Sequence, residues 1–386
     1  MNKKFVIFAS VLIYFISAYF SYDFFSASAG TGGLGGKSSV TEVPINGAEV
    51  DQSQFVGPKT EECPINGEKL TKKHRELWEK RRPLGVMIEN HTDARPQSGL
   101  SSADTIYEAV AEGGITRFLA IFYCKDARFI GPVRSARVYF LSLVQGYGAN
   151  PLYVHVGGAN HPGKADALGT ISKIGWGNYN DLNQFSIPFP TFYRDYERNP
   201  GVATEHTMYS STSRLWKYAA VSRKLTDVDE ENNSWDEDFE PWAFQDGKAV
   251  ADPVLKIAYD FWEGKGDFSV VWKYDPTTNS YSRSHGDGKP HIDKNTKEAI
   301  SVKNVIVAFM EESPANDGYP GGHLLYETIG KGEAIVFHNG EAIKGSWKKP
   351  EKESQIRFYD SSGEEIELVR GQVWVSIVPD GNEVDY

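Results

Sequence analysis

The stretch TRFLAIFYC, residues 116–124, has the length and the apolar, aromatic composition of a buried β-strand. Upstream of it, RPLGVMIEN at residues 82–90 predicts a second strand that runs into a polar segment. Downstream, PLYVHVGG at residues 151–158 predicts a third strand, which ends in a double glycine. These three segments predict the sheet of the first folded region.

Segments with a helical pattern separate and follow the predicted strands. They are SGLSSADTIYEAVAEGG (residues 98–114), GPVRSARVYFLSLVQGYG (131–148) and STSRLWKYAAVSRK (211–224). A serine or a proline stands at the start of each, and Ser210 or Ser211 is the expected N-cap of the third. Because strands alternate with helices, we predict a layered α/β domain at residues 59–225.

The composition changes after residue 225. Residues 226–240, TDVDEENNSWDEDFE, contain eight acidic side chains and no basic one, which predicts a solvated acidic loop at a domain boundary. The ligand spacing and the turn glycine of a calcium loop are missing, so a calcium site is the less favoured interpretation. Residues 241–386 contain short aromatic and β-branched segments separated by turn signals. They predict a mostly antiparallel, β-rich second domain, and the protein as a whole is α+β.

Net charge and the N-terminal segment limit the location and the partners. The 386-residue chain has a net charge of -11, so we expect no nucleic-acid partner. Phe5 to Tyr22 is an uncharged apolar stretch of 18 residues, long enough for a signal anchor in the cell membrane. A small-residue cleavage pattern follows it, so residues 1–29 are either a retained anchor or a cleaved signal peptide. In both cases the bulk of the chain is extracytoplasmic, behind a flexible linker at residues 30–58.

The state of the two cysteines, Cys63 and Cys124, stays open at this point. In an oxidising compartment they can form a disulfide. Alternatively, Cys124 is a buried thiol in its strand and Cys63 an exposed one. Neither stands in the electropositive setting of a catalytic thiol.

Arg134 and Arg137 stand near the start of the helix predicted at residues 131–148, where the helix dipole disfavours cations. A negative group is therefore expected beside them. One interpretation is a phosphate or carboxylate ligand held by the two guanidinium groups. The other, which the sequence favours, is internal pairing with acidic residues of the same domain, namely Glu89, Asp104, Glu108 or Glu112.

Two more residues are candidates for an anionic-ligand site. Arg117 opens a predicted strand, and strand ends in α/β domains tend to gather ligand groups. His155 precedes the double glycine of its strand, which leaves the backbone open to a ligand. A histidine satisfied within the core is the more common role for such a residue.

Three residues are candidate acids or bases: Asp104, Glu108 and His206, which follows Glu205 directly. Adjacent residues on an extended segment point to opposite faces, which weakens the idea of a Glu205–His206 pair. We assign no catalytic residue. The sequence has no metal-type spacing and no cofactor motif, so we expect neither a metal nor a cofactor.

Several long segments carry a family resemblance. They are RRPLGVMIENHTDARPQSGL (81–100), IGPVRSARVYF (130–140) and YETIGKGEAIVFHNGEAIKGSWKK (326–349). They closely resemble the YerB family of bacterial envelope proteins, which have a two-part domain of unknown function, and the likeness extends over about residues 60–386. The resemblance implies an extracytoplasmic, membrane-attached protein, typically a lipoprotein, with no assigned reaction. Since no cysteine lies near the apolar segment, an anchor helix or a cleaved signal would replace the lipid.

The leading hypothesis is therefore a non-enzymatic binding or assembly factor with an arginine-lined pocket for an anionic ligand. Its partner would be a cell-wall component or an envelope protein. The alternative comes from a second resemblance, by analogy, to the LytR-CpsA-Psr ligases, in which SADT (102–105) and GPVRSAR (131–137) would be the counterparts. It implies a Mg²⁺-dependent transferase or hydrolase acting on pyrophosphate-linked polymers. The pyrophosphate would be held by Arg117, Arg134 and Arg137, and the acid or base would be Asp104, Glu108 or His155.

Overall fold

The computed structural model of the chain describes residues 55–386. The predicted signal anchor or signal peptide at residues 1–29 and nearly all of the predicted linker lie outside the described residues. Among the residues that are described, no helix is both long enough and apolar enough to cross a membrane.

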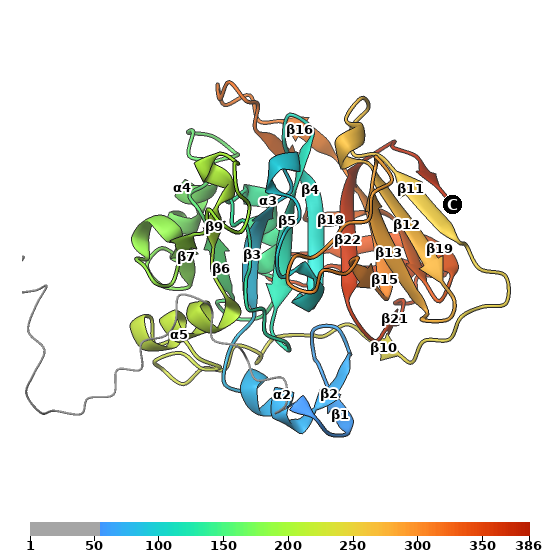
Figure 1. The fold of residues 1–386 in the computed structure, drawn as a ribbon, viewed down its shortest axis with the longest axis horizontal. Coiled ribbons are helices and arrows are strands. Elements are labelled where there is room, and N and C mark those ends of the chain that lie inside the picture. The colour runs from blue at the N-terminus through green and yellow to red at the C-terminus, as the bar shows by residue number, and fades with distance from the viewer. Residues whose placement is uncertain (1–54) are drawn as a thin grey trace, which may run out of the picture. The chain divides into compact units, whose positions relative to one another are not determined.

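A mixed sheet of ten strands is the centre of the fold (Figure 1). In spatial order the strands are β20 (Arg357–Asp360), β19 (Glu341–Lys349), β18 (Gly330–His338), β15 (Asn304–Met310), β22 (Val373–Pro379), β4 (Thr105–Glu112), β5 (Ile115–Phe122), β3 (Leu84–Glu89), β6 (Leu152–His155) and β7 (Asp181–Asn183). The strands predicted at 82–90, 116–124 and 151–158 are confirmed as β3, β5 and β6. β5 pairs antiparallel with β4 and β3, whereas β3 and β6 are parallel.

This sheet contains strands from both halves of the chain. β4 of the first half pairs in parallel with β22 of the second, and β22 pairs in parallel with β15. The pairs β15–β18, β18–β19 and β19–β20 are antiparallel. The predicted fold class, a layered α/β part followed by a mostly antiparallel β-rich part, is confirmed.

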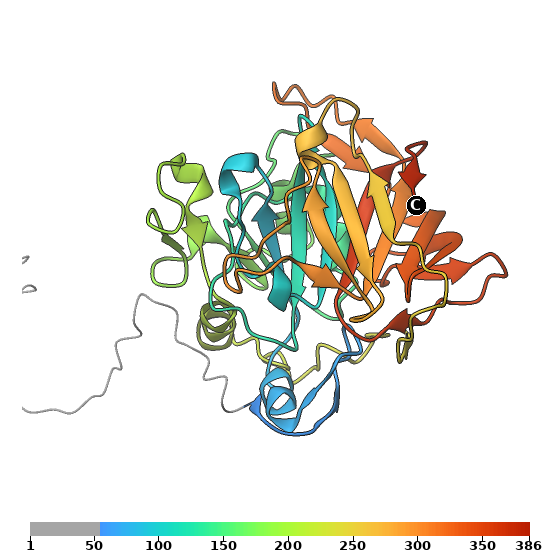
Figure 2. The same ribbon diagram turned by 45° about the vertical axis from the view of Figure 1, so that its right-hand side comes forward.

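A second sheet of five antiparallel strands packs on the large sheet (Figure 2). Its order is β14 (Ser301–Val302), β13 (Ser280–His285), β12 (Val270–Asp275), β11 (Lys256–Tyr259) and β23 (Val384–Asp385). Trp272 of β12 meets Trp374 of β22 edge-on, with ring centroids 5.4 Å apart. The Tyr259 hydroxyl of β11 lies 2.6 Å from Ser376 Oγ of β22. Aromatic contacts and buried hydrogen bonds therefore join the two sheets.

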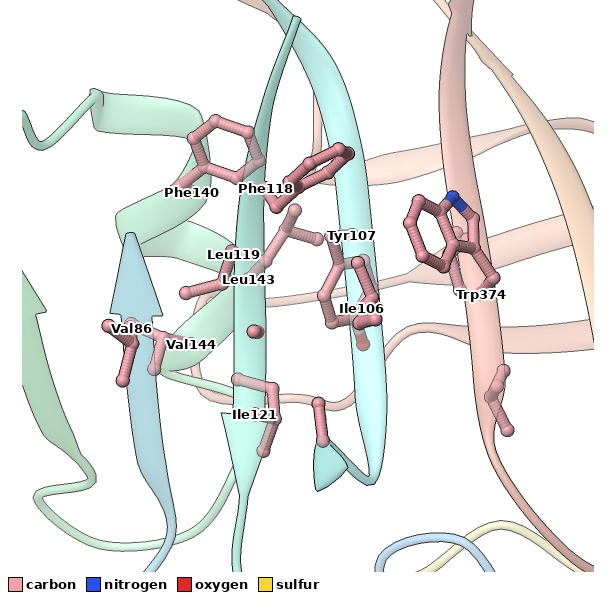
Figure 3. Packing of buried hydrophobic residues seen from close by; sticks show 14 of the residues in the cluster. Val86, Ile106, Tyr107, Phe118, Leu119, Ile121, Phe140, Leu143, Val144 and Trp374 are labelled. Carbon is pink, nitrogen blue, oxygen red and sulfur yellow. The ribbon is translucent and has the colours of Figure 1, made fainter. Parts of the chain in front are cut away.

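Short helices and small strand pairs complete the described part. The helices are α2 (Lys72–Trp78), α3 (Val138–Val144), α4 (Ala167–Lys173) and α5 (Thr212–Ser222), and the pairs are β1 (Lys59–Glu62) with β2 (Lys69–Thr71), β8 (Tyr193–Arg194) with β9 (Met208–Tyr209), β10 (Phe244–Gln245) with β21 (Leu368–Val369), and β16 (Glu312–Pro314) with β17 (Leu324–Tyr326). Figure 3 shows Phe140, Leu143 and Val144 of α3 beside Leu119 and Ile121 of β5. Helix α3 thus covers the middle of the large sheet with apolar side chains.

The predicted helix at residues 211–224 is confirmed as α5. Its N-cap is Ser211, whose side-chain oxygen accepts the backbone N–H of Arg214 at 3.3 Å. This bond satisfies one of the backbone donors that the first turn of a helix leaves unpaired.

The prediction of a helix over residues 98–114 is wrong. A 3-10 turn at Leu100–Ser102 leads into β4, which turns through Gly113 and Gly114 into β5. Both glycines have positive φ, 59° and 81°, which a tight hairpin turn of this kind requires. Strand β4 is buried on both faces, so its sequence lacks the alternation that distinguishes a strand from a helix.

The helix predicted at residues 131–148 begins later than expected. Helix α3 starts at Val138, and Arg137 is its N-cap residue, with an extended backbone. The residues before it are extended because their backbone groups bond to β3 and to the segment around β9. Arg134 and Arg137 therefore lie outside the first helical turn, and the dipole argument does not apply to them.

Cys63 and Cys124 form a disulfide, so the pairing that the sequence left open is resolved. The bond links the end of the β1–β2 hairpin to the chain just after β5. It fastens a small peripheral hairpin to the central sheet.

Residues 226–240 form turns and bends, and most of their acidic side chains are exposed. Trp235 of the same segment is buried, and its ring lies against that of Tyr123 with ring centroids 4.9 Å apart. Phe239 also packs against the core, so two aromatic residues attach the acidic segment to it.

Candidate functional site

The loop that follows β3, residues 90–97, separates two groups of charged side chains. β3 and β5 are antiparallel, and Glu89 at the end of β3 faces Arg117 at the start of β5. The first group surrounds Glu89 and Glu112, and the second surrounds Glu108. Both lie at the end of the sheet where the ligand groups of the sequence analysis were expected.

The first group binds the predicted arginines internally. Arg134 Nε lies 3.1 Å from a carboxylate oxygen of Glu89. Glu112 accepts from Arg117 Nη2 at 3.4 Å and forms a close ion pair with Arg137. Burial lowers the pKa of both the Arg117 and the Arg137 guanidinium. The internal-pair interpretation thus describes Arg134 and Arg137, with Glu89 and Glu112 as the partners.

His206 pairs with Glu89 and not with its neighbour in sequence. His206 Nδ1 lies 2.9 Å from Glu89 Oε2, and both side chains are buried. Glu205 is more than half exposed and lies 3.6 Å from Arg134 Nη2. The sequence missed Glu89 as the partner of His206 because 117 residues separate the two.

His155 is fully buried and has a partner on each ring nitrogen. Nδ1 lies 2.7 Å from the Gly157 carbonyl oxygen, and Nε2 lies 2.6 Å from Asp181 Oδ1. These contacts describe a satisfied core histidine, and they leave neither nitrogen for a ligand.

Asp104 stabilises the backbone beside the disulfide. Its carboxylate accepts the Tyr123 N–H at 2.6 Å, the Cys124 N–H at 2.9 Å and the Asn66 amide at 3.1 Å. Complete burial raises the pKa of Asp104 to about 6. Although Asp104, Cys63 and Cys124 lie close together, both sulfurs belong to the disulfide and no thiolate is available as a metal ligand.

The second group centres on a fully buried ion pair. Glu108 of β4 accepts from Arg283 Nη2 of β13 at 2.9 Å on each carboxylate oxygen. Thr116 Oγ1 (2.8 Å) and Trp374 Nε1 (3.2 Å) also donate to this carboxylate. The pair links the two sheets across 175 residues of sequence. The sequence analysis missed Arg283, although a charged residue between two buried positions of an alternating strand is a signal for such a partner.

Two histidines lie beside Arg283 in the same group. His291 Nδ1 lies 2.9 Å from Arg283 Nη1, and its Nε2 lies 2.8 Å from Gln97 Oε1. The His285 ring lies beside that of His291 in a tilted arrangement, with ring centroids 4.4 Å apart. Burial, together with the charge of Arg283, lowers the pKa of His285 to about 2. Both rings are therefore neutral at physiological pH.

A cleft of about 500 Å³ opens beside this second group. It is lined by Thr92, Arg95, Pro96, Asp267, His285, Asp287, Lys289, Pro290, His291 and Ile292. Arg95 Nε donates to Asn90 Oδ1 at 3.0 Å, and the guanidinium lies over the Phe268 ring at 5.1 Å. Its Nη2 is buried and has no hydrogen-bond partner among the described residues. No local pattern singled out Arg95 in the sequence.

Burial, with the charge of Arg283 nearby, lowers the pKa of Arg95 to about 10. The group remains charged at neutral pH, and no carboxylate of residues 55–386 forms an ion pair with it. An anion in the cleft would supply the missing partner.

Replacing Arg137 by alanine is expected to lower the free energy of unfolding by about 2 kcal/mol, because partly buried Glu112 then loses one of its two arginines. Arg134→Ala should cost less than about 1 kcal/mol, since Arg134 is partly exposed and Glu89 keeps His206. Urea unfolding of both variants measures the difference. An Arg134→Ala/Arg137→Ala double variant as stable as the wild type would show that these two arginines do not stabilise the core.

The fold and the site define a two-part mixed α/β protein in which Arg117, Arg134, Arg137 and Arg283 pair with carboxylates and Arg95 lines a cleft. Comparison with known proteins then identifies its family. Residues 69–226 match the model of the N-terminal domain of "Protein of unknown function (DUF3048)", and residues 257–375 match the model of its C-terminal domain. The chain belongs to this family, so the predicted resemblance to YerB proteins is confirmed.

One relative, YerB of Bacillus subtilis, illustrates the likeness both in sequence and in structure. YerB of Bacillus subtilis (strain 168), described as a candidate lipoprotein, is 32% identical over 320 residues, which cover 82% of this chain and 86% of the relative. The crystal structure of the Bacillus subtilis YerB protein superposes with a TM-score of 0.67 at 27% identity, covering 84% of this chain and all of that one.

Proposed function

We propose that the protein is an extracytoplasmic, membrane-attached envelope protein that acts by binding a ligand and not by catalysis. The relative described as a candidate lipoprotein supports attachment to a membrane. The apolar segment from Phe5 to Tyr22 gives this chain a means of attachment. The Cys63–Cys124 disulfide supports an oxidising compartment.

The observation that carries the binding proposal is Arg95. Its Nη2 is buried without a hydrogen-bond partner among residues 55–386, and its side chain lines the cleft of about 500 Å³. An unpaired buried donor on a charged group is costly, and a ligand oxygen removes that cost. We therefore propose Arg95 as the anion-binding residue, in place of the predicted Arg117, Arg134 and Arg137.

The enzyme alternative receives less support from the geometry. It needs Arg117, Arg134 and Arg137 to hold pyrophosphate, but these arginines already contact Glu89 and Glu112. The proposed acids and bases are engaged as well, each with at least one partner inside the protein: Asp104, Glu108, His155 and His206. A general acid or base must reach the substrate, and these groups are buried.

The other charges of the cleft narrow the class of ligand. Asp267 and Asp287 line it together with Lys289, which pairs with Asp287 at 2.7 Å. A multiply charged anion would be repelled by the two carboxylates. The cleft suits a ligand with one anionic group beside hydroxyl or amino groups, such as a cell-wall fragment with a free carboxylate or a segment of an envelope protein.

Thermal unfolding of the full chain in detergent tests the proposal. The probes are soluble cell-wall fragments with free carboxylates, inorganic phosphate, and a short polyprenyl pyrophosphate with Mg²⁺. A ligand that binds only the folded state raises the unfolding midpoint. We expect the wall fragments to do so, and Arg95→Gln to weaken that binding roughly tenfold, the loss of one charge-assisted hydrogen bond.

Two outcomes would refute the proposal. Arg357→Gln is the matched control, because Arg357 is a partly buried arginine that pairs with Glu365 and does not line the Arg95 cleft. The anion site is refuted if no probe raises the unfolding midpoint. It is also refuted if a probe raises the midpoint of Arg95→Gln as much as that of the control. Turnover of the polyprenyl pyrophosphate would instead establish the enzyme alternative.

A further inference from the structure

A cluster of potential metal ligands belongs to the first group of side chains, the one around Glu89. It lies where the loop after β3 meets the 3-10 turn Thr204–His206. His91, Asp93 and His206 each offer one potential ligand atom, and these atoms all lie within 4.8 Å of one another. The two imidazole rings are stacked, with centroids 5.0 Å apart. We propose that these three residues form a binding site for a divalent transition metal, with zinc as the best match.

The surroundings of His206 are those of a metal ligand. Its Nδ1 lies 2.9 Å from Glu89 Oε2, so Nδ1 can carry the proton and donate it to the carboxylate. The lone pair is then on Nε2, which has no hydrogen-bond partner among the described residues that a metal would displace. Metal-binding histidines commonly donate their second nitrogen to a carboxylate in this way, because the bond fixes the tautomer and the ring orientation.

His91 and Asp93 can adjust to a metal. They flank Thr92 on a 3-10 turn, and their side chains are 34% and 60% exposed. His91 Nδ1 now accepts the Asp93 backbone N–H at 3.2 Å and lies 3.7 Å from Asp93 Oδ2. Zinc holds imidazole and carboxylate ligands at about 2.0–2.2 Å, so binding would draw these two exposed side chains toward His206.

The charges and the ligand types favour zinc over other cations. The carboxylates of Glu89, Asp93 and Glu205 outnumber the one arginine of the cluster, Arg134. Two imidazoles and one carboxylate are a common zinc ligand set, whereas calcium and magnesium prefer oxygen ligands only. Three protein ligands leave a fourth position for water or for a group of a partner.

This inference is independent of the Arg95 cleft and goes beyond the proposed function. No spacing in the sequence indicates this site, because His206 is far in sequence from His91 and Asp93. Only the approach of the 3-10 turn at Thr204–His206 to the end of β3 brings the ligands together.

Metal titration of the full chain in detergent tests the site, with Zn²⁺ measured by calorimetry and Co²⁺ by its visible absorption. We expect one ion per chain and a tetrahedral Co²⁺ spectrum. His91→Ala and Asp93→Asn should each weaken binding tenfold or more. Glu89→Gln, which alters the support of His206 and weakens the pairing of Arg134 but removes no metal ligand, should weaken it about 10- to 100-fold.

The matched control is His74→Ala, since His74 contacts Thr71 and Phe55 and not the cluster. Circular dichroism establishes that each variant is folded. His91 and Asp93 are exposed loop residues, so their variants keep the test valid if His206 or Glu89 variants unfold. A wild type without stoichiometric binding would overturn the proposal, as would His91→Ala and Asp93→Asn variants that bind like His74→Ala.

Discussion

Replacing Arg283 by methionine is expected to lower the free energy of unfolding by about 3–5 kcal/mol. Glu108 and Arg283 are both fully buried, and Arg283 donates to the two carboxylate oxygens. Methionine keeps much of the side-chain volume but leaves the Glu108 charge without a partner in the core. The cost is that of an uncompensated buried charge and not that of a lost contact.

Urea unfolding of the wild type, Arg283→Met and Arg357→Met measures this effect. Arg357 also pairs with a carboxylate, but its side chain and that of Glu365 are partly exposed, so its loss should cost less than about 1 kcal/mol. The double variant Glu108→Gln/Arg283→Met should recover part of the stability, since it removes both charges. Equal losses in Arg283→Met and Arg357→Met would show that the buried pair has no special weight.

Removing the disulfide is expected to cost about 4 kcal/mol. The variant is Cys63→Ala/Cys124→Ala, in which alanine avoids adding a polar group at two buried positions. The bond closes a loop with a sequence separation of 61 residues, and the entropy of the unfolded chain rises when such a loop opens, by the equivalent of about 4 kcal/mol. The β1–β2 hairpin would then be held by its packing and by polar contacts such as Asn66 with Asp104 and Glu68 with Lys125.

Chemical unfolding with and without a reductant measures this cost. The wild type should lose stability on reduction, and the alanine variant should not respond to the reductant. A loss below about 1 kcal/mol would mean that the unfolded chain retains structure around the two positions. Asp104 also holds this segment, because its carboxylate accepts hydrogen bonds from the Tyr123 and Cys124 N–H groups.

The two proposals have a common structural basis in the loop after β3. His91 and Asp93 belong to the proposed metal site, and Thr92 and Arg95 line the cleft. Loops at strand ends can carry exposed polar groups while the strand itself is held rigidly in the sheet. The buried pair of Glu108 and Arg283 is linked to Arg95 through Asn90, which contacts both Glu108 and Arg95. We expect the pair to stabilise this loop without contacting a ligand.

Local patterns of the sequence determined several features correctly. The strands at residues 82–90, 116–124 and 151–158 have apolar composition and turn signals at their ends, which do not depend on tertiary neighbours. The α5 cap at Ser211 is also local, because the bond spans three residues. The long segments of family resemblance determined the family.

The tertiary structure alone decided the rest. The segment at 98–114 became a strand because β22 and β5 flank it on both sides, and burial of both faces removes the alternation that marks a strand. The segment before Val138 stayed extended because β3 offers it backbone hydrogen bonds. In both cases long-range pairing prevailed over a local helical preference.

The charged residues show the same division. The sequence determined that arginines near a core need acidic partners, since an unpaired buried charge is costly. It did not determine which partners they have, because Arg137 meets Glu112, His206 meets Glu89 and Arg283 meets Glu108 only after the sheets assemble. Sheet order and sheet packing bring together Glu108 and Arg283, which are 175 positions apart, and no local periodicity records that distance.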